Sequence, residues 1–124
     1  MKALRDHPDQ ERLRADARRV LADNLPAGDA ELGQVIFGLL IMYAEFDRRA
    51  EASKTMVVTQ WRQSLKSWPR DVLERAAQSW ISGPKAAFVP QPGDILAQCQ
   101  RHGAFRRAMA KKAREFLDFK GDTL

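Results

Sequence analysis

The hydrophobic and polar positions of this chain follow a helical period almost throughout. Apolar residues recur every three to four positions, and no segment alternates apolar and polar side chains as a half-buried strand does. The dipeptides Asn-Gly and Asp-Gly, which mark tight hairpins, are absent from the sequence. The pattern therefore predicts an all-α protein, built as a compact bundle of about five to six helices.

Proline, glycine and polar turns divide the first half into three helices. A charged helix is expected over residues 8–24, because proline suits the first helical turn. The most apolar helix is expected over residues 29–46, with Asp29 as its N-cap, and a third helix over residues 55–67. Gly38 lies inside the apolar helix, where glycine costs about 1 kcal/mol relative to alanine. We therefore expect a close packing contact at Gly38.

The second half contains two helices opened by proline. Pro69 is expected to open the fourth helix, which ends at Gly83, and Pro92 to open the fifth, which ends at Gly103. A proline-rich connector joins these two helices, and its Phe88 is expected to fill the core. A sixth helix is expected over residues 104–118.

Three segments follow from this division. Residues 1–28 form a charged N-terminal helix with a narrow apolar stripe, and residues 29–103 form the helical core domain. Residues 104–124 form a basic C-terminal helix and tail. From Arg101 onward the chain has seven basic and three acidic residues, so this end carries +4 of the net charge of +5. Such a surface suits nucleic acid or an acidic protein, or is simply a solvated helix face.

The composition narrows the classes of protein further. The chain has 124 residues, enough for one domain with a modest core. The longest apolar run, residues 35–44, is too short to cross a bilayer, and a charged segment follows Met1 where a signal peptide would be apolar. The single Cys99 fits a reducing compartment. We therefore expect a cytoplasmic protein with no membrane partner.

Residues with catalytic or metal-binding chemistry are few. Cys99 is expected to be a buried thiol, and His102 lies one turn away without a further partner. His7 is flanked by acidic residues, but at a terminus. Trp61 and Trp80 have the spacing of core residues, and Trp68 is expected to be partly exposed. We therefore expect no enzyme, no cofactor, no metal site and no small-molecule substrate.

The order of motifs from Trp61 to Ile95 indicates a family. An apolar helix ends in aromatic residues, and a second helix carries Trp61 and Leu65 four residues apart. The sequences WPRDVLERA, WI and FVPQPGDI follow, beginning at residues 68, 80 and 88. Over residues 32–100 the chain resembles the phage helicase loader/inhibitor family, small all-helical proteins that act on the DnaB-type hexameric replicative helicase. It differs from the family in its additional charged helix before Asp29.

The resemblance implies a function and a position for the binding residues. Family members have a structured helical domain followed by a mobile C-terminal region that engages the helicase, and here that region would follow Gly103. We therefore expect a non-enzymatic adaptor of phage or prophage DNA replication that loads or inhibits the helicase. The expected partner-binding residues are Arg106, Arg107, Lys111, Lys112 and Arg114.

Two alternatives stay open. The basic C-terminal helix also fits a nucleic-acid-binding helical module, in which the same cations contact DNA phosphates. The third possibility is a phage inhibitor of another host complex, acting through the same helix. The sequence does not separate this third function from the first.

Overall fold

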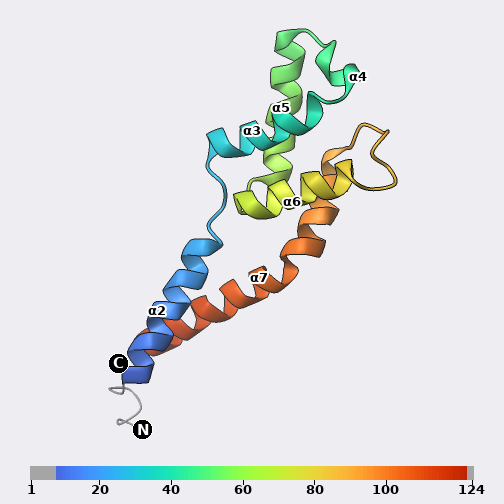
Figure 1. The fold of residues 1–124 in the computed structure, drawn as a ribbon. Coiled ribbons are helices and arrows are strands. Elements are labelled where there is room, and N and C mark those ends of the chain that lie inside the picture. Colours follow the sequence, from blue (N-terminus) through green and yellow to red (C-terminus); the bar gives the residue numbers. More distant parts are fainter. Residues whose placement is uncertain (1–7, 123–124) are drawn as a thin grey trace. The chain divides into compact units, whose positions relative to one another are not determined.

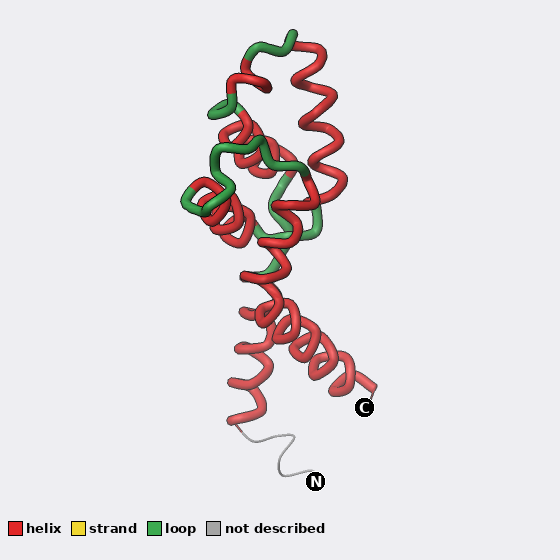
Figure 2. Tube along the Cα trace, turned by 90° about the vertical axis from the view of Figure 1, so that its right-hand side faces the viewer, coloured by secondary structure: helices red, strands yellow, loops and turns green. Residues whose placement is uncertain are grey.

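The structure is a computed structural model that describes residues 8–122, and every regular element in this range is an α-helix (Figures 1 and 2). The all-α class predicted from the pattern is confirmed. The proline-rich connector also lies where it was expected, between the fourth and fifth predicted helices. The elements are α2 (Pro8–Asp23), α3 (Asp29–Leu40), α4 (Ala44–Asp47), α5 (Glu51–Leu65), α6 (Arg70–Ile81) and α7 (Pro92–Asp122).

The chain divides into two units. The core unit is the continuous segment Pro26–Ala104, which contains α3 to α6 and the beginning of α7. The terminal unit combines the two ends of the chain, up to Leu25 and from Phe105 onward, so its helices are α2 and the rest of α7. The first and last helices, distant in sequence, therefore belong to the same unit.

In the core unit α3 packs against both α5 and α6 (Figure 1). Trp61, Trp80 and Cys99 are buried, as the sequence predicted. Trp68 is also buried, with only 2% of its surface exposed, so the expectation of partial exposure is wrong. The cluster they form is apolar and holds most of the large buried side chains of the described chain: Leu32, Ile36, Leu39, Leu40, Phe46, Leu65, Val72, Leu73 and Ile95.

The first turn of α3 is tied to α6. Gly28, not Asp29, is the N-cap residue, and its backbone N–H donates to Oε1 of Glu31 at 3.2 Å. Arg70, at the start of α6, donates to Oε2 of the same carboxylate at 3.3 Å. The hydrogen bond from Gly28 and then the bond and charge of Arg70 hold the pKa of Glu31 below its ordinary value. The carboxylate thus joins two helix N-termini.

The long apolar helix expected over residues 29–46 is interrupted. α3 ends at Leu40, Tyr43 has an extended backbone, and the short helix α4 follows. The interruption lets the Tyr43 hydroxyl donate to the carbonyl oxygen of Ala86 at 2.7 Å, which ties this turn to the connector. Phe46 is buried beyond the break and meets the ring of Phe37 edge to face, with centroids 5.8 Å apart.

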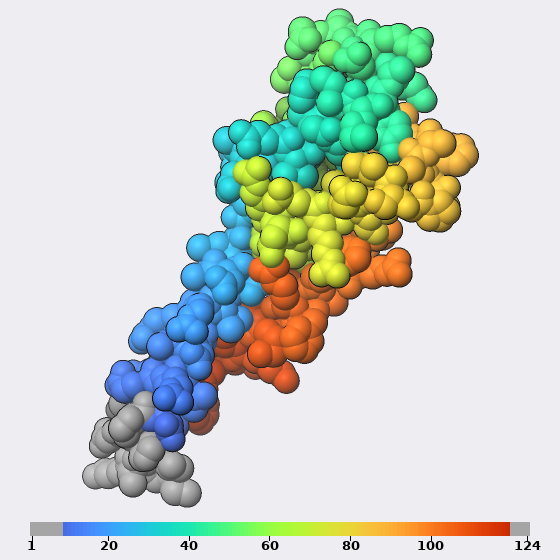
Figure 3. Space-filling model, viewed as in Figure 1, coloured from blue at the N-terminus to red at the C-terminus, as the bar shows by residue number. Residues whose placement is uncertain are grey.

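The connector between α6 and α7 lies on the surface of the core unit (Figure 3). Phe88 is 68% exposed, so the prediction that its ring fills the core is wrong. Phe88 contacts the core through its backbone instead. Nε1 of Trp80 donates a hydrogen bond to the carbonyl oxygen of Phe88 at 3.1 Å. Pro90 is the fully buried side chain of the segment.

The fifth and sixth predicted helices are one continuous helix, α7, so Gly103 does not end a helix. No glycine of the described chain has a positive φ, the conformation that a terminating glycine adopts. Gly103 instead allows α7 to approach Trp68, because a Cβ at this position would lie 2.5 Å from Cζ3 of the indole. Gly103 is thus a close-packing position, whereas a Cβ at Gly38 would meet no atom within 4 Å.

Candidate partner-binding site

The five cations expected to bind a partner all lie on the part of α7 in the terminal unit. There α7 runs antiparallel to α2 (Figure 1). Ala17 of α2 and Ala110 and Ala113 of α7 are the buried apolar residues of this unit in the described chain. Alanines permit a close helix–helix approach, but they bury little apolar surface.

Arg106 points toward α2. Its Nε donates to Oδ1 of Asn24 at 3.1 Å, and a terminal guanidinium nitrogen donates to the backbone carbonyl of Asp23 at 2.6 Å. Asn24 in turn donates to the carbonyl of Val20 at 2.8 Å. The last carbonyls of a helix lack partners within the helix and attract cations. Arg106 therefore caps the C-terminus of α2, and its guanidinium is used within the chain.

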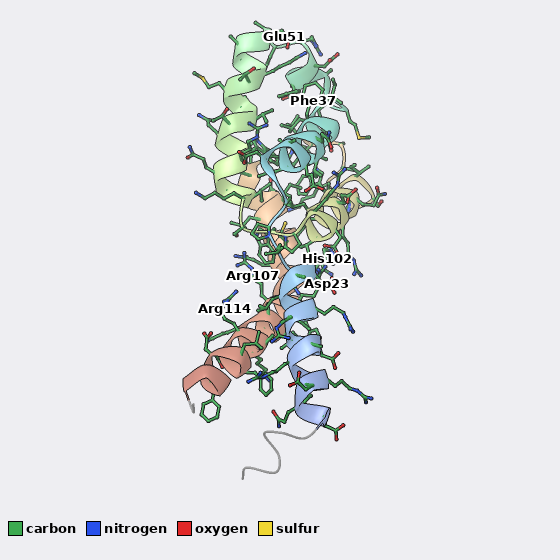
Figure 4. All side chains as sticks on the ribbon, turned by 90° about the vertical axis from the view of Figure 1, so that its left-hand side faces the viewer. Asp23, Phe37, Glu51, His102, Arg107 and Arg114 are labelled. Atoms are coloured by element: carbon green, nitrogen blue, oxygen red, sulfur yellow. The ribbon has the colours of Figure 1, made fainter. Side chains whose placement is uncertain are left out.

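Arg107, Lys111 and Arg114 form a second set, which we call the basic face. Their spacing of four and three residues places them on one side of α7, and all three residues are exposed. Figure 4 labels Arg107 and Arg114 along this part of the helix. Of the five expected residues, these three are the ones that share a solvent-facing side.

Lys112 lies on a third side of the helix, among aromatic residues. With 3.6 residues per turn, the spacing of four, three, four and three places one set of residues in a single line along α7. We call this set the phenylalanine stripe. It consists of Phe105, Met109, Lys112, Phe116 and Phe119.

Most of the stripe is exposed to solvent. Phe105 is 76% exposed, Phe119 is 68% exposed and Met109 is 39% exposed. The buried side of this part of α7 carries Ala110 and Ala113. This part of α7 therefore has two apolar sides, of which only the one with the alanines is buried.

Four-fifths of the net charge lies in the terminal unit. Its sequence contains twelve Lys and Arg residues against eight Asp and Glu residues, a net charge of +4 out of +5 for the whole chain. α2 contributes the exposed cations Arg18 and Arg19, of which Arg19 pairs with Asp16 at 3.5 Å. The sequence of this unit is therefore basic overall, and the basic face contributes three of its cations.

The core unit carries a separate groove of about 420 Å³ between α3 and α5, which sequence reasoning missed. Lys54 pairs with Glu51 at 3.6 Å along one wall. The guanidinium of Arg62 lies against Gly33, and its buried Nε has no hydrogen-bond partner in the described chain. Phe37 and Glu51 mark the groove in Figure 4. Gly33 and Arg62 have no recognisable spacing in sequence, so only the packing of α3 on α5 brings them together.

The two groups considered for catalysis, Cys99 and His102, both lie in the core unit. Cys99 is fully buried in the core unit and His102 is partly buried. Within residues 8–122 no group of three or more His, Cys, Asp or Glu side chains could hold a metal ion. His7 lies outside the described residues. No helix in the described range combines the length and apolar character needed to cross a membrane.

Comparison of the chain with models of known protein families, with curated protein sequences and with solved structures gave no match. The resemblance to the helicase loader/inhibitor family therefore remains an interpretation of the residues between Trp61 and Ile95.

Proposed function

We propose that this chain is a non-enzymatic adaptor of phage or prophage DNA replication. It binds the DnaB-type hexameric replicative helicase in the cytoplasm and either loads it or holds it inactive. The order of motifs from Trp61 to Ile95 supports the choice of partner.

The observation that carries the proposal is the basic face. Arg107, Lys111 and Arg114 are exposed on one side of α7, in the terminal unit. Arg106 is engaged with α2, and Lys112 belongs to the phenylalanine stripe. The proposed helicase contact therefore narrows from five residues to three. Three cations on one side of a helix fit an acidic surface on a partner.

The test is size-exclusion chromatography with light scattering of the full chain mixed with the host's replicative helicase. The wild-type chain is expected to elute with the hexamer. The variant R107Q/K111Q/R114Q is expected to elute separately, because it loses the charges that steer and hold the complex. Absence of co-elution for the wild-type chain would overturn the helicase as partner.

A matched variant separates a local effect from a loss of total charge. R48Q/K66Q/R75Q removes three exposed cations from the core unit and leaves the basic face intact. It is expected to co-elute as the wild-type chain does. Equal loss of binding in both variants would show that net charge matters and that the basic face is not the contact.

The net charge of +4 on the terminal unit favours a second candidate function, a module that binds nucleic acid. Fluorescence anisotropy with a labelled duplex tests it. Binding through phosphates weakens steeply with salt, and the logarithm of the affinity falls by about 0.9 per phosphate contact for each tenfold rise in salt. R107Q/K111Q/R114Q is then expected to reduce this slope by up to about three contacts. An affinity for the duplex that does not change with salt concentration would exclude nucleic-acid binding through phosphates.

A further inference from the structure

The terminal unit has a very small interior. Among its described residues, three alanines are buried, and the larger side chains Val20 and Leu117 are only partly covered. Helices in water depend on tertiary packing for most of their stability, and a pair of helices with so little buried apolar surface gains little of it. The described part of this unit therefore buries little of the apolar surface that would stabilise its helices.

The missing contact is on the phenylalanine stripe. Phe105 and Phe119 lie two heptads apart on the same side of α7 and leave most of their ring surfaces in water. Met109 and Phe116 fill the turns between them. The alternation of four and three residues is the spacing of a coiled-coil seam, so this face has the geometry to pack against another helix.

The charges along the stripe indicate what covers it. Lys112 is the one cation within the stripe, and Glu115 follows one turn later on the flank away from α2. Each copy therefore presents a cation in the stripe and an anion beside it, one turn apart. Two such faces related by a twofold axis can place Lys112 of each against Glu115 of the other. The basic face is on a different side of α7, so its like charges stay out of such a contact.

We propose that the phenylalanine stripe is an interface for a second copy of this chain, which forms a twofold-symmetric dimer. The α2–α7 pairs of the two copies then combine into a four-helix arrangement that buries the phenylalanines. Self-association of this kind is independent of helicase binding. The dimer would display two basic faces, and neither would be part of the contact between the copies.

Sedimentation velocity of the full chain over a wide range of protein concentration tests the proposal. The wild-type chain is expected to dimerise reversibly. F105S/F119S is expected to weaken dimerisation by more than tenfold. F88S removes a phenylalanine of the core unit that is as exposed as Phe119, and it is expected to leave dimerisation unchanged. A wild-type chain that stays monomeric throughout, or an unchanged dimer in F105S/F119S, would overturn the proposal.

Charge reversal tests whether the occupant is a second copy. K112E and E115K are each expected to weaken the dimer, because each places like charges in contact. The double variant K112E/E115K is expected to restore it, since both partners change together. A double variant as weak as the single variants would exclude this pairing and with it the proposed symmetric interface.

Cross-linking gives an answer that does not depend on removing any aromatic residue. Ala108 is exposed on the free flank of the stripe, so A108C is expected to form a covalent dimer with a short bismaleimide. A22C, at an exposed position of α2, is the control and is expected to remain a monomer under the same treatment. Equal cross-linking at both positions would indicate random collision and would count against the interface.

Discussion

Gly103 lies directly against the indole ring of Trp68, and the contact leaves no room for a methyl group. A Cβ at Gly103 would be 2.5 Å from Cζ3 and 3.1 Å from Cε3 of the ring, and 3.1 Å from Cγ1 of Val72. Trp68 and Val72 are both buried, so neither side chain can move away without disturbing the core. The glycine is required by packing, not by a turn.

G103A is therefore expected to lower the free energy of unfolding by about 1–2 kcal/mol. Overpacking a core typically costs about 1–3 kcal/mol, and the better helix propensity of alanine returns up to about 1 kcal/mol. Urea denaturation followed by tryptophan fluorescence measures the change. G38A is the control, and it is expected to stabilise the protein by up to about 1 kcal/mol because its Cβ meets open space. Stabilisation by both variants would contradict the Trp68 contact.

The ring of Trp80 is buried in the core, and its indole N–H donates a hydrogen bond to the connector. W80A is expected to cost about 3–5 kcal/mol of stability, the range for emptying a large aromatic site. W80F keeps much of the apolar volume but removes the hydrogen bond to the carbonyl of Phe88, so it should cost less. Thermal unfolding compares the two variants. A melting temperature of W80A close to that of the wild-type chain would show that the ring is not part of the core.

Arg106 is expected to matter for the stability of α2. R106Q removes the cation and the bonds to Asn24 and Asp23, which should destabilise the end of α2 by about 1 kcal/mol. Hydrogen exchange of the amides in the last turns of α2 measures this loss. R114Q, which removes a cation from the basic face of the same helix, is expected to leave that exchange unchanged. Identical exchange in the two variants would argue against the capping contact.

The lowered pKa of Glu31 predicts a specific pH dependence. A carboxyl group whose pKa is lower in the folded state stabilises the fold above its unfolded pKa, and this contribution is lost as the pH falls through the folded pKa. R70Q is expected to raise the pKa of Glu31 only partway, because the larger effect, the bond from the Gly28 N–H, remains. A carboxyl titration by nuclear magnetic resonance measures it, with R75Q as the control. An unchanged pKa in R70Q would exclude the ion pair in solution.

Apolar periodicity was sufficient to predict the helical class and the burial of Trp61, Trp80 and Cys99. These features depend on local preference and on which side of a helix is apolar, and both can be read along the chain. The prediction for Phe88 was wrong because it also used only the local sequence. A hydrophobic residue beside two prolines suggested a buried ring, whereas the core needed only its carbonyl.

The tertiary structure decided what depends on contacts between distant residues. Gly103 had the sequence features of a helix end, but the ring of Trp68 makes it a packing position within a continuous helix. Arg106 could not be separated from its neighbours by sequence, because its partner Asn24 lies 82 residues away. The sequence by itself determined that the C-terminal helix carries both basic and apolar residues. The packing of α2 on one side of α7 determined which cations face solvent and which aromatic residues stay exposed. This could not be read from the sequence, because the sequence does not say which side of α7 its neighbour covers.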